Sequence, residues 1–95
     1  MPISTAEIYQ FNCLPFDKKK EALISFSLPE KSKVLLNIYN EQDSEVRLLI
    51  NEYLQPAAYE VNFLYGNLAA GSYCIKLIVQ TENIVDINSL IIQIP

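Results

Sequence analysis

One stretch, residues 68–79, constrains the fold more than any other, because a glycine turn leads directly into an alternating strand. Gly71 can adopt backbone angles that a residue with a Cβ resists, so we expect a tight turn there. After it, every second residue is large and apolar, as in a strand with one buried face. These inward positions are Tyr73, Ile75, Leu77 and Val79. The pattern predicts the central strand of a β-sandwich.

Tyr73 occupies the first inward position of this strand. Its ring would lie in the core and its hydroxyl at the edge of the core, where a buried phenol needs a hydrogen-bond partner. In the tyrosine corner of immunoglobulin-like sandwiches that partner is a backbone carbonyl. We predict the same kind of bond for Tyr73.

Six further segments have the composition of strands and are separated by turn residues. They are residues 7–12, 22–28, 34–39, 45–52, 58–64 and 84–94. The first is expected to end where Pro15 prevents further pairing, and the third to follow the second through a loop of hairpin length. Seven strands at intervals of roughly ten residues favour one all-β domain over residues 1–95, a single antiparallel immunoglobulin-like (fibronectin-III-like) β-sandwich.

Most of these segments show which face is buried, and segment 45–52 does not. The clear inward positions are Ile24, Phe26, Leu28, Val34, Leu36, Ile38, Tyr59, Val61 and Phe63. In segment 45–52, the apolar residues Val46, Leu48, Leu49 and Ile50 cannot all lie on one face of a regular strand. A helix also fits their spacing, but about two turns of helix are marginal alone. We therefore favour a strand with a bulge.

Composition limits the possible partners. The chain of 95 residues carries a net charge of −4, and its cationic side chains apart from Lys76 lie between Lys18 and Arg47. This balance disfavours nucleic acid as a partner. The 51% apolar content is needed to fold so short a chain, so we expect no cavity for a small-molecule substrate. No apolar run approaches the roughly 20 residues of a membrane-spanning helix, so we expect no membrane insertion.

The start of the chain and its cysteines bear on localisation. Residues 1–5 lack the basic and apolar regions of a secretory signal. We expect the chain to stay inside the cell, to be a domain of a longer exported protein, or to travel with an assembly. Cys74 should point outward beside Lys76, so we expect no inter-sheet disulfide with Cys13 and two free thiols.

No catalytic template fits the chain. It contains no histidine, so serine or cysteine triads and the usual zinc sites are excluded. Its two glycines cannot form a phosphate-binding loop. Four carboxylates have the spacing of a calcium loop, but Val46 stands where such a loop needs glycine. They are Glu41, Asp43, Glu45 and Glu52. We therefore expect no enzyme, no cofactor and no metal site.

Two features suggest contact with a protein partner or self-association. The last strand ends in a nearly uninterrupted apolar run, which at a sheet edge could pair with another chain or could simply be buried. Two tyrosines fall on outward or loop positions, where they could form an aromatic recognition spot or be scattered surface residues. The candidate interaction residues are Leu90, Ile91, Ile92, Ile94, Tyr39 and Tyr65.

Five sequence blocks between about Phe11 and Ile94 occur in the order and spacing of one protein family. They are Ile24–Glu30 (ISFSLPE), Val34–Asn40 (VLLNIYN), Glu45–Leu49 (EVRLL), Ala58–Phe63 (AYEVNF) and Leu68–Tyr73 (LAAGSY). With these blocks the chain resembles the immunoglobulin-like carboxy-terminal domains of bacterial type IX secretion substrates and the similar domain of flagellar hook-capping proteins.

The resemblance implies a non-catalytic sandwich that export machinery recognises, or a structural module of an extracellular assembly. Sorting domains of this family usually carry paired lysines before the last strand, where this chain has Asn88 and Ser89. We expect a protein–protein interaction module of the sorting or attachment kind. The alternative is a small structural or adaptor subunit of a multi-protein assembly. Sugar binding is a weaker alternative, because the chain contains no tryptophan.

Overall fold

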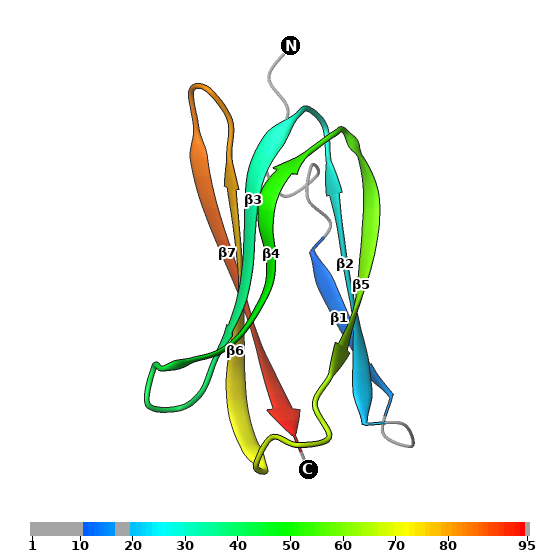
Figure 1. Cartoon of the computed structure of the whole chain (residues 1–95), viewed down its shortest axis with the longest axis vertical. Coiled ribbons are helices and arrows are strands. Elements are labelled where there is room, and N and C mark those ends of the chain that lie inside the picture. The colour runs from blue at the N-terminus through cyan, green and yellow to red at the C-terminus, as the bar shows by residue number, and fades with distance from the viewer. Residues whose placement is uncertain (1–10, 17–19, 95) are drawn as a thin grey trace.

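Two antiparallel sheets lie face to face and form a β-sandwich (Figure 1). The computed structural model describes residues 11–16 and 20–94. Within these ranges the strands are β1 (Asn12–Phe16), β2 (Glu21–Leu28), β3 (Ser32–Tyr39), β4 (Glu45–Leu54), β5 (Ala57–Leu64), β6 (Gly71–Gln80) and β7 (Val85–Ile94). One sheet has the order β1-β2-β5 and the other the order β4-β3-β6-β7. The predicted all-β sandwich of seven strands is confirmed.

Strand β6 lies at the centre of the larger sheet, between β3 and β7, as the alternation predicts. Its four predicted inward side chains are all buried. Gly71 begins the strand with a φ of 149°, a conformation that favours glycine, and so confirms the predicted turn. The Tyr73 hydroxyl donates a hydrogen bond to the Ala69 carbonyl at 2.6 Å. The predicted partner of this phenol is therefore confirmed.

The inward positions predicted for β2, β3 and β5 are also confirmed, because side chains at alternate positions lie in the core. Phe26 stacks on Tyr59 across the β2–β5 pair, with ring centroids 5.5 Å apart. The short loop after β2 does not close a hairpin, however. Strand β2 pairs with β1 and β5, whereas β3 pairs with β4 and β6 in the opposite sheet. Strands β2 and β3 each have one apolar face, and the two faces are buried against each other when the strands lie in opposite sheets. The loop of hairpin length between them therefore connects the two sheets.

Strand β4 confirms the predicted bulge and rules out the helix. Its register with β3 shifts at two places, so Leu49 and Val46 each lack a direct partner on β3. Both side chains still pack against the core. An extra residue in one strand changes the phase of its side chains, which explains how consecutive apolar residues reach the same interior.

Strand β1 differs from the prediction that Pro15 ends the first strand. Pro15 lies within β1 and aligns with Ala22 of β2. The physical reason is that β1 is an edge strand, where proline is tolerated because one side of the strand makes no ladder bonds within its sheet. Residues 7–10 of the predicted first strand, and the lysines at 18 and 19, lie outside the described residues.

Candidate interaction surface

The candidate site is the outer face of the β4-β3-β6-β7 sheet, the side that points away from the smaller sheet. Strand pairing aligns Leu35 of β3 with Ile78 of β6, and Ile78 with Ile87 of β7. Residues directly opposite each other in antiparallel strands place their side chains on the same face. The sheet therefore carries a row of aliphatic side chains from β3 to β7 on the surface.

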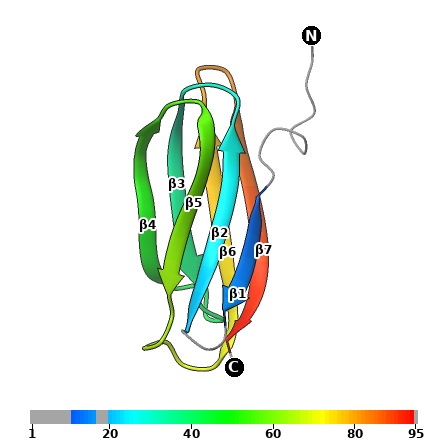
Figure 2. The same ribbon diagram turned by 90° about the vertical axis from the view of Figure 1, so that its right-hand side faces the viewer.

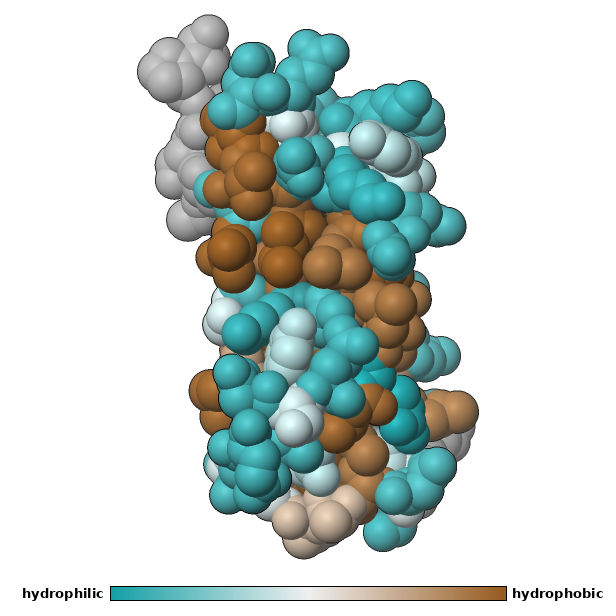
Figure 3. Space-filling view, turned by 60° about the vertical axis from the view of Figure 1, so that its left-hand side comes forward, coloured by the Kyte–Doolittle hydropathy of each residue, from teal (hydrophilic) through white to brown (hydrophobic). Residues whose placement is uncertain are grey.

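Further exposed apolar side chains extend this row. We call the set the apolar band, and it consists of Leu35, Leu48, Ile78, Val85 and Ile87. Ile87 is 63% exposed and Val85 is 58% exposed, so these side chains lie largely in solvent. Figure 3 shows brown side chains gathered across the upper part of this face. Contiguous exposed apolar patches on soluble domains typically mark interaction sites.

Strand β7 is also an edge of this sheet. Figure 2 shows β7 at one side of the sandwich and β4 at the other. Among the described residues, β7 pairs with β6 alone. It contains ten residues in continuous register with β6, and after Asp86 it contains no charged residue and no proline. An edge strand of this kind is open to pairing with another chain.

The candidate residues of the last strand fall on both of its faces. Ile91 is 67% exposed on the outer face, where it aligns with Cys74. Leu90, Ile92 and Ile94 point inward and pack in or against the core, and Ile94 is buried. The period of two in a strand causes this division. Of the candidate residues in the last strand, Ile91 therefore lies on the outer face of the sheet.

The two candidate tyrosines do not meet. Tyr39 lies on the outer face, partly buried, and the Lys76 Nζ is 4.6 Å from its ring centroid. Tyr65 was expected at an outward or loop position, but it is buried, with its ring centroid 6.1 Å from that of Phe63. Its amide donates to the Lys20 carbonyl, which ties the residue to the end of the smaller sheet. Tyr65 does lie just after β5, but its predicted exposure is wrong, because it continues the period-two inward phase of Val61 and Phe63.

Sequence reasoning missed the residues of the apolar band on β7. A signal was present, because Leu90, Ile92 and Ile94 set an inward phase that continues back through Asn88 and Asp86. That phase leaves the intervening residues on the outer face, and the structure places Val85, Ile87 and Ile91 there. In the first half of β7, the polar residues Asp86 and Asn88 therefore point inward, and the aliphatic residues Val85 and Ile87 face solvent.

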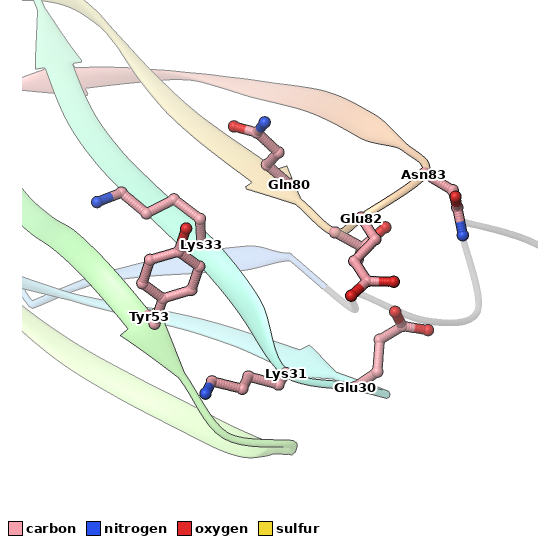
Figure 4. A pocket seen from close by; sticks show the side chains of 8 residues that line it. Glu30, Lys31, Lys33, Tyr53, Gln80, Glu82 and Asn83 are labelled. Atoms are coloured by element: carbon pink, nitrogen blue, oxygen red, sulfur yellow. The ribbon is translucent and has the colours of Figure 1, made fainter.

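An open hollow of about 670 Å³ lies at one end of the sandwich (Figure 4). Its lining comes from the turns after β2 and β6 and from β3 and β4, and includes Glu30, Glu82 and Tyr53. The Nζ of Lys33 and the Nζ of Lys31 lie 5.2 Å and 6.0 Å from the Tyr53 ring centroid, within the range of cation–π attraction. The lining mixes charges of both signs and resembles a solvated surface more than a shaped ligand site.

Neither cysteine lies in a reactive setting. Cys13 and Cys74 are both free and both partly buried. Burial raises the pKa of the Cys13 thiol above its usual value, which lowers the fraction of reactive thiolate. Cys74 lies on the outer face beside Lys76, as the strand phase predicts. Cys13 packs against the core, whereas Cys74 lies on the outer face of the larger sheet.

The acidic residues with calcium-loop spacing have separate roles. A Glu41 carboxylate oxygen accepts the Ser72 amide at 2.9 Å, which joins the loop after β3 to the start of β6. Glu45 accepts a hydrogen bond from the Asn37 side-chain amide. Within the ranges that the structure describes, no group of three acidic, cysteine or histidine side chains could hold a metal ion. The same ranges hold no helix long and apolar enough to cross a membrane.

The comparison with known proteins adds no assignment to this geometry. No protein-family model matches the chain, and no curated protein matches it. What the observations establish is a small all-β domain with seven strands in two antiparallel sheets. It exposes apolar side chains on one face, next to an edge strand, β7, that no other described residue pairs with apart from β6.

Proposed function

We propose that this domain is a non-catalytic module that works through protein–protein contact at the outer face of its four-stranded sheet. The observation that carries the proposal is the apolar band, in which side chains such as Leu48 and Ile87 are more than half exposed. Covering apolar surface stabilises a complex in proportion to the area removed from water. A flat sheet face offers this area to another folded protein more readily than to a small molecule.

Two features support a binding role over an enzymatic one. The chain has no histidine, so the commonest general base and the histidine-containing triads are missing from its sequence. The titratable side chains at the open hollow come with opposite charges, Lys31 and Lys33 against Glu30 and Glu82. A solvated, open arrangement of this kind does not supply the dry, pre-organised dipoles that catalysis requires.

The finer version of the proposal is a sorting or attachment domain of an exported protein. The blocks that resemble type IX secretion substrates support it, and LAAGSY in particular forms the turn and the tyrosine hydrogen bond of β6. The alternative is a small structural or adaptor subunit, which the unprotected β7 edge favours. Both versions use protein contact, and they differ in whether the partner is the export machinery or an assembly.

A bait experiment tests the proposal of protein contact. The immobilised chain is incubated with extract of its source cell, beside a double variant in which Leu48→Lys and Ile87→Lys place two charges on the apolar band. Both side chains are exposed, so the variant should keep its fold, which circular dichroism checks. We expect a defined protein, or the chain itself, on the wild-type bait and its loss on the variant. Equal capture by both baits, with no self-association, would refute the proposal.

A reporter fusion separates the two versions. The domain is joined to the carboxyl end of a periplasmic reporter in a bacterium that has a type IX secretion system. A sorting domain brings the reporter to the cell surface or the medium, and the Tyr73→Ala variant, whose core is damaged, serves as the inactive control. A reporter that stays in the periplasm with both fusions favours the structural or adaptor subunit.

A further inference from the structure

We infer that β7 pairs with β7 of a second copy of this chain, antiparallel about a twofold axis near Ser89, so that two four-stranded sheets join into one continuous sheet. This inference rests on the proposed function and names the partner at the edge of the proposed surface. It begins from a comparison of the four sheet edges. These edges are β1 and β5 in the smaller sheet and β4 and β7 in the larger one.

The other three edges carry features that oppose pairing with another chain. Strand β1 has five residues and contains Pro15. Strand β4 has two register shifts and carries charges at Glu45, Arg47 and Glu52. Strand β5 has Glu60 near its middle. Short length, proline, bulges and charges are the devices by which natural proteins protect sheet edges.

Strand β7 has none of these features over its last eight residues, Ile87–Ile94. It pairs with β6 without a register shift along all ten residues. An uncharged aliphatic strand of this kind, left open at an edge, has the sequence signature of an aggregating segment. A soluble protein that keeps such a strand is expected to cover it with a defined partner.

The hydrogen-bond pattern shows which backbone groups of β7 point toward the open edge. The Thr81 amide donates to the Ile84 carbonyl at 2.9 Å and closes the β6–β7 turn. Bonded and non-bonded pairs alternate along an antiparallel ladder. Counting from the turn, the bonded pairs therefore involve Asp86, Asn88 and Leu90. The residues between them, including Ser89, direct their amides and carbonyls away from β6.

The same intervening residues carry the outward side chains, which makes the edge self-complementary. With the axis at Ser89, Ile87 of each copy lies directly opposite Ile91 of the other. Residues opposite each other in antiparallel strands have Cβ atoms about 5 Å apart. Because Ile87 aligns with Ile78 and Ile91 aligns with Cys74, the apolar row would run without a break from one copy into the next.

Charge does not oppose this register. Asp86 is the charged residue of β7, and it would lie opposite Ile92 of the second copy, not opposite its own counterpart. Ser89 is small and would meet its counterpart at the axis, where a bulky side chain would crowd the outer face. A twofold, isologous contact of this type closes on itself and gives a dimer, not a fibre.

Light scattering after size exclusion, over a range of concentrations, tests the inference on the full chain. We expect the wild type to reach twice its mass of 10.8 kDa. Ile91→Lys should raise the dissociation constant at least about 100-fold, because the change acts twice across the axis. Leu64→Lys is the matched control, since it places the same charge at an exposed residue of β5, an edge strand of the smaller sheet outside the apolar band, and it should remain dimeric.

Ser89→Pro provides a second variant with an independent readout. If the Ser89 amide points to the open edge, proline there removes no bond to β6, so the fold survives and the dimer is lost. In a Cys74→Ser background, S89C should form a disulfide across the axis, because Cα atoms of a bonded antiparallel pair are about 5.5 Å apart.

Three outcomes would overturn the inference. One is a wild type that stays monomeric up to about 1 mM, and another is a dimer that Leu64→Lys disrupts and Ile91→Lys does not. The third is S89C that stays reduced while the wild type dimerises. The first outcome leaves the proposed function standing if the wild-type bait still captures a protein that the variant of the apolar band does not. The second moves the self-contact from β7 to the smaller sheet, and the proposed function then stands only if the wild-type bait still captures a protein that the variant of the apolar band does not.

Discussion

Replacing Tyr73 by phenylalanine removes one oxygen and leaves the ring in place. The lost atom donates a 2.6 Å hydrogen bond to the Ala69 carbonyl at a partly buried position, and the Tyr73 residue is 6% exposed. The variant forms no large cavity, so its cost is that of the bond and of a carbonyl left without this donor. This amounts to about 1–2 kcal/mol of unfolding free energy.

Tyr59→Phe is the matched control for this variant. The Tyr59 hydroxyl also donates at 2.6 Å to the carbonyl four residues earlier, Gln55, but this bond is exposed. Water can replace an exposed donor, so we expect a loss below about 0.5 kcal/mol. The pair therefore differs in burial and not in geometry.

Thermal unfolding followed by circular dichroism measures both variants. For a domain of this size, Tyr73→Phe should lower the melting temperature by about 5–12 °C, and Tyr59→Phe by no more than about 3 °C. Equal losses, or a Tyr73→Phe variant as stable as the wild type, would refute the claim that the buried phenol anchors the start of β6.

Three further predictions concern the core, the turn and the thiol. Leu77→Ala should lower the unfolding free energy by about 2–5 kcal/mol in urea unfolding, because the side chain is fully buried. Gly71→Ala should cost about 1–3 kcal/mol, since φ is 149° and a Cβ would lie 3.0 Å from a Glu41 carboxylate oxygen, whereas Gly66→Ala should change little. Burial raises the pKa of the Cys13 thiol, so this thiol should react with iodoacetamide more slowly than in the unfolded chain, as measured by mass spectrometry. The unfolding free energy should also fall as the pH rises above the usual thiol pKa, because the unfolded chain then loses the Cys13 proton while the folded chain keeps it.

The sequence predicts the strands of this domain well where one face alternates strictly. In β6 and β5 the apolar positions have a period of two, so the inward residues follow directly. Even the hydroxyl partner of Tyr73 follows, because a phenol at the first inward position reaches back to the preceding turn. The local sequence pattern predicts the inward residues when burial of one strand face contributes most of the stability.

Pairing and edges are less predictable, because they depend on contacts far apart in the sequence. The loop after β2 has hairpin length, but it connects the two sheets. The proline-containing first segment indicates an edge strand, and β1 is one, but Pro15 lies inside the strand and does not end it. Tyr65 follows a strand and precedes Gly66, a context typical of an exposed loop, but it keeps the inward phase of Val61 and Phe63 and packs on Phe63.

The candidate surface could be predicted from the sequence only in part. Ile91 was predicted as an interaction residue and is exposed on the outer face. Val85 and Ile87 follow from the same phase once the inward positions of β7 are extended to its polar half. Hydrophobic content alone misleads here, because strand phase decides which side of β7 a residue occupies, and the polar residues Asp86 and Asn88 occupy the inner one.

Amide hydrogen exchange along β7, measured by NMR at low and high protein concentration, tests the protein contact most directly. The amides of Asn88 and Leu90 bond to β6 and should be protected at both concentrations. Those of Ile87, Ser89 and Ile91 should be exposed in the dilute protein and become protected as concentration rises. Exchange of these three amides that does not change with concentration, while the wild type shows no other bound protein, would contradict contact at this edge.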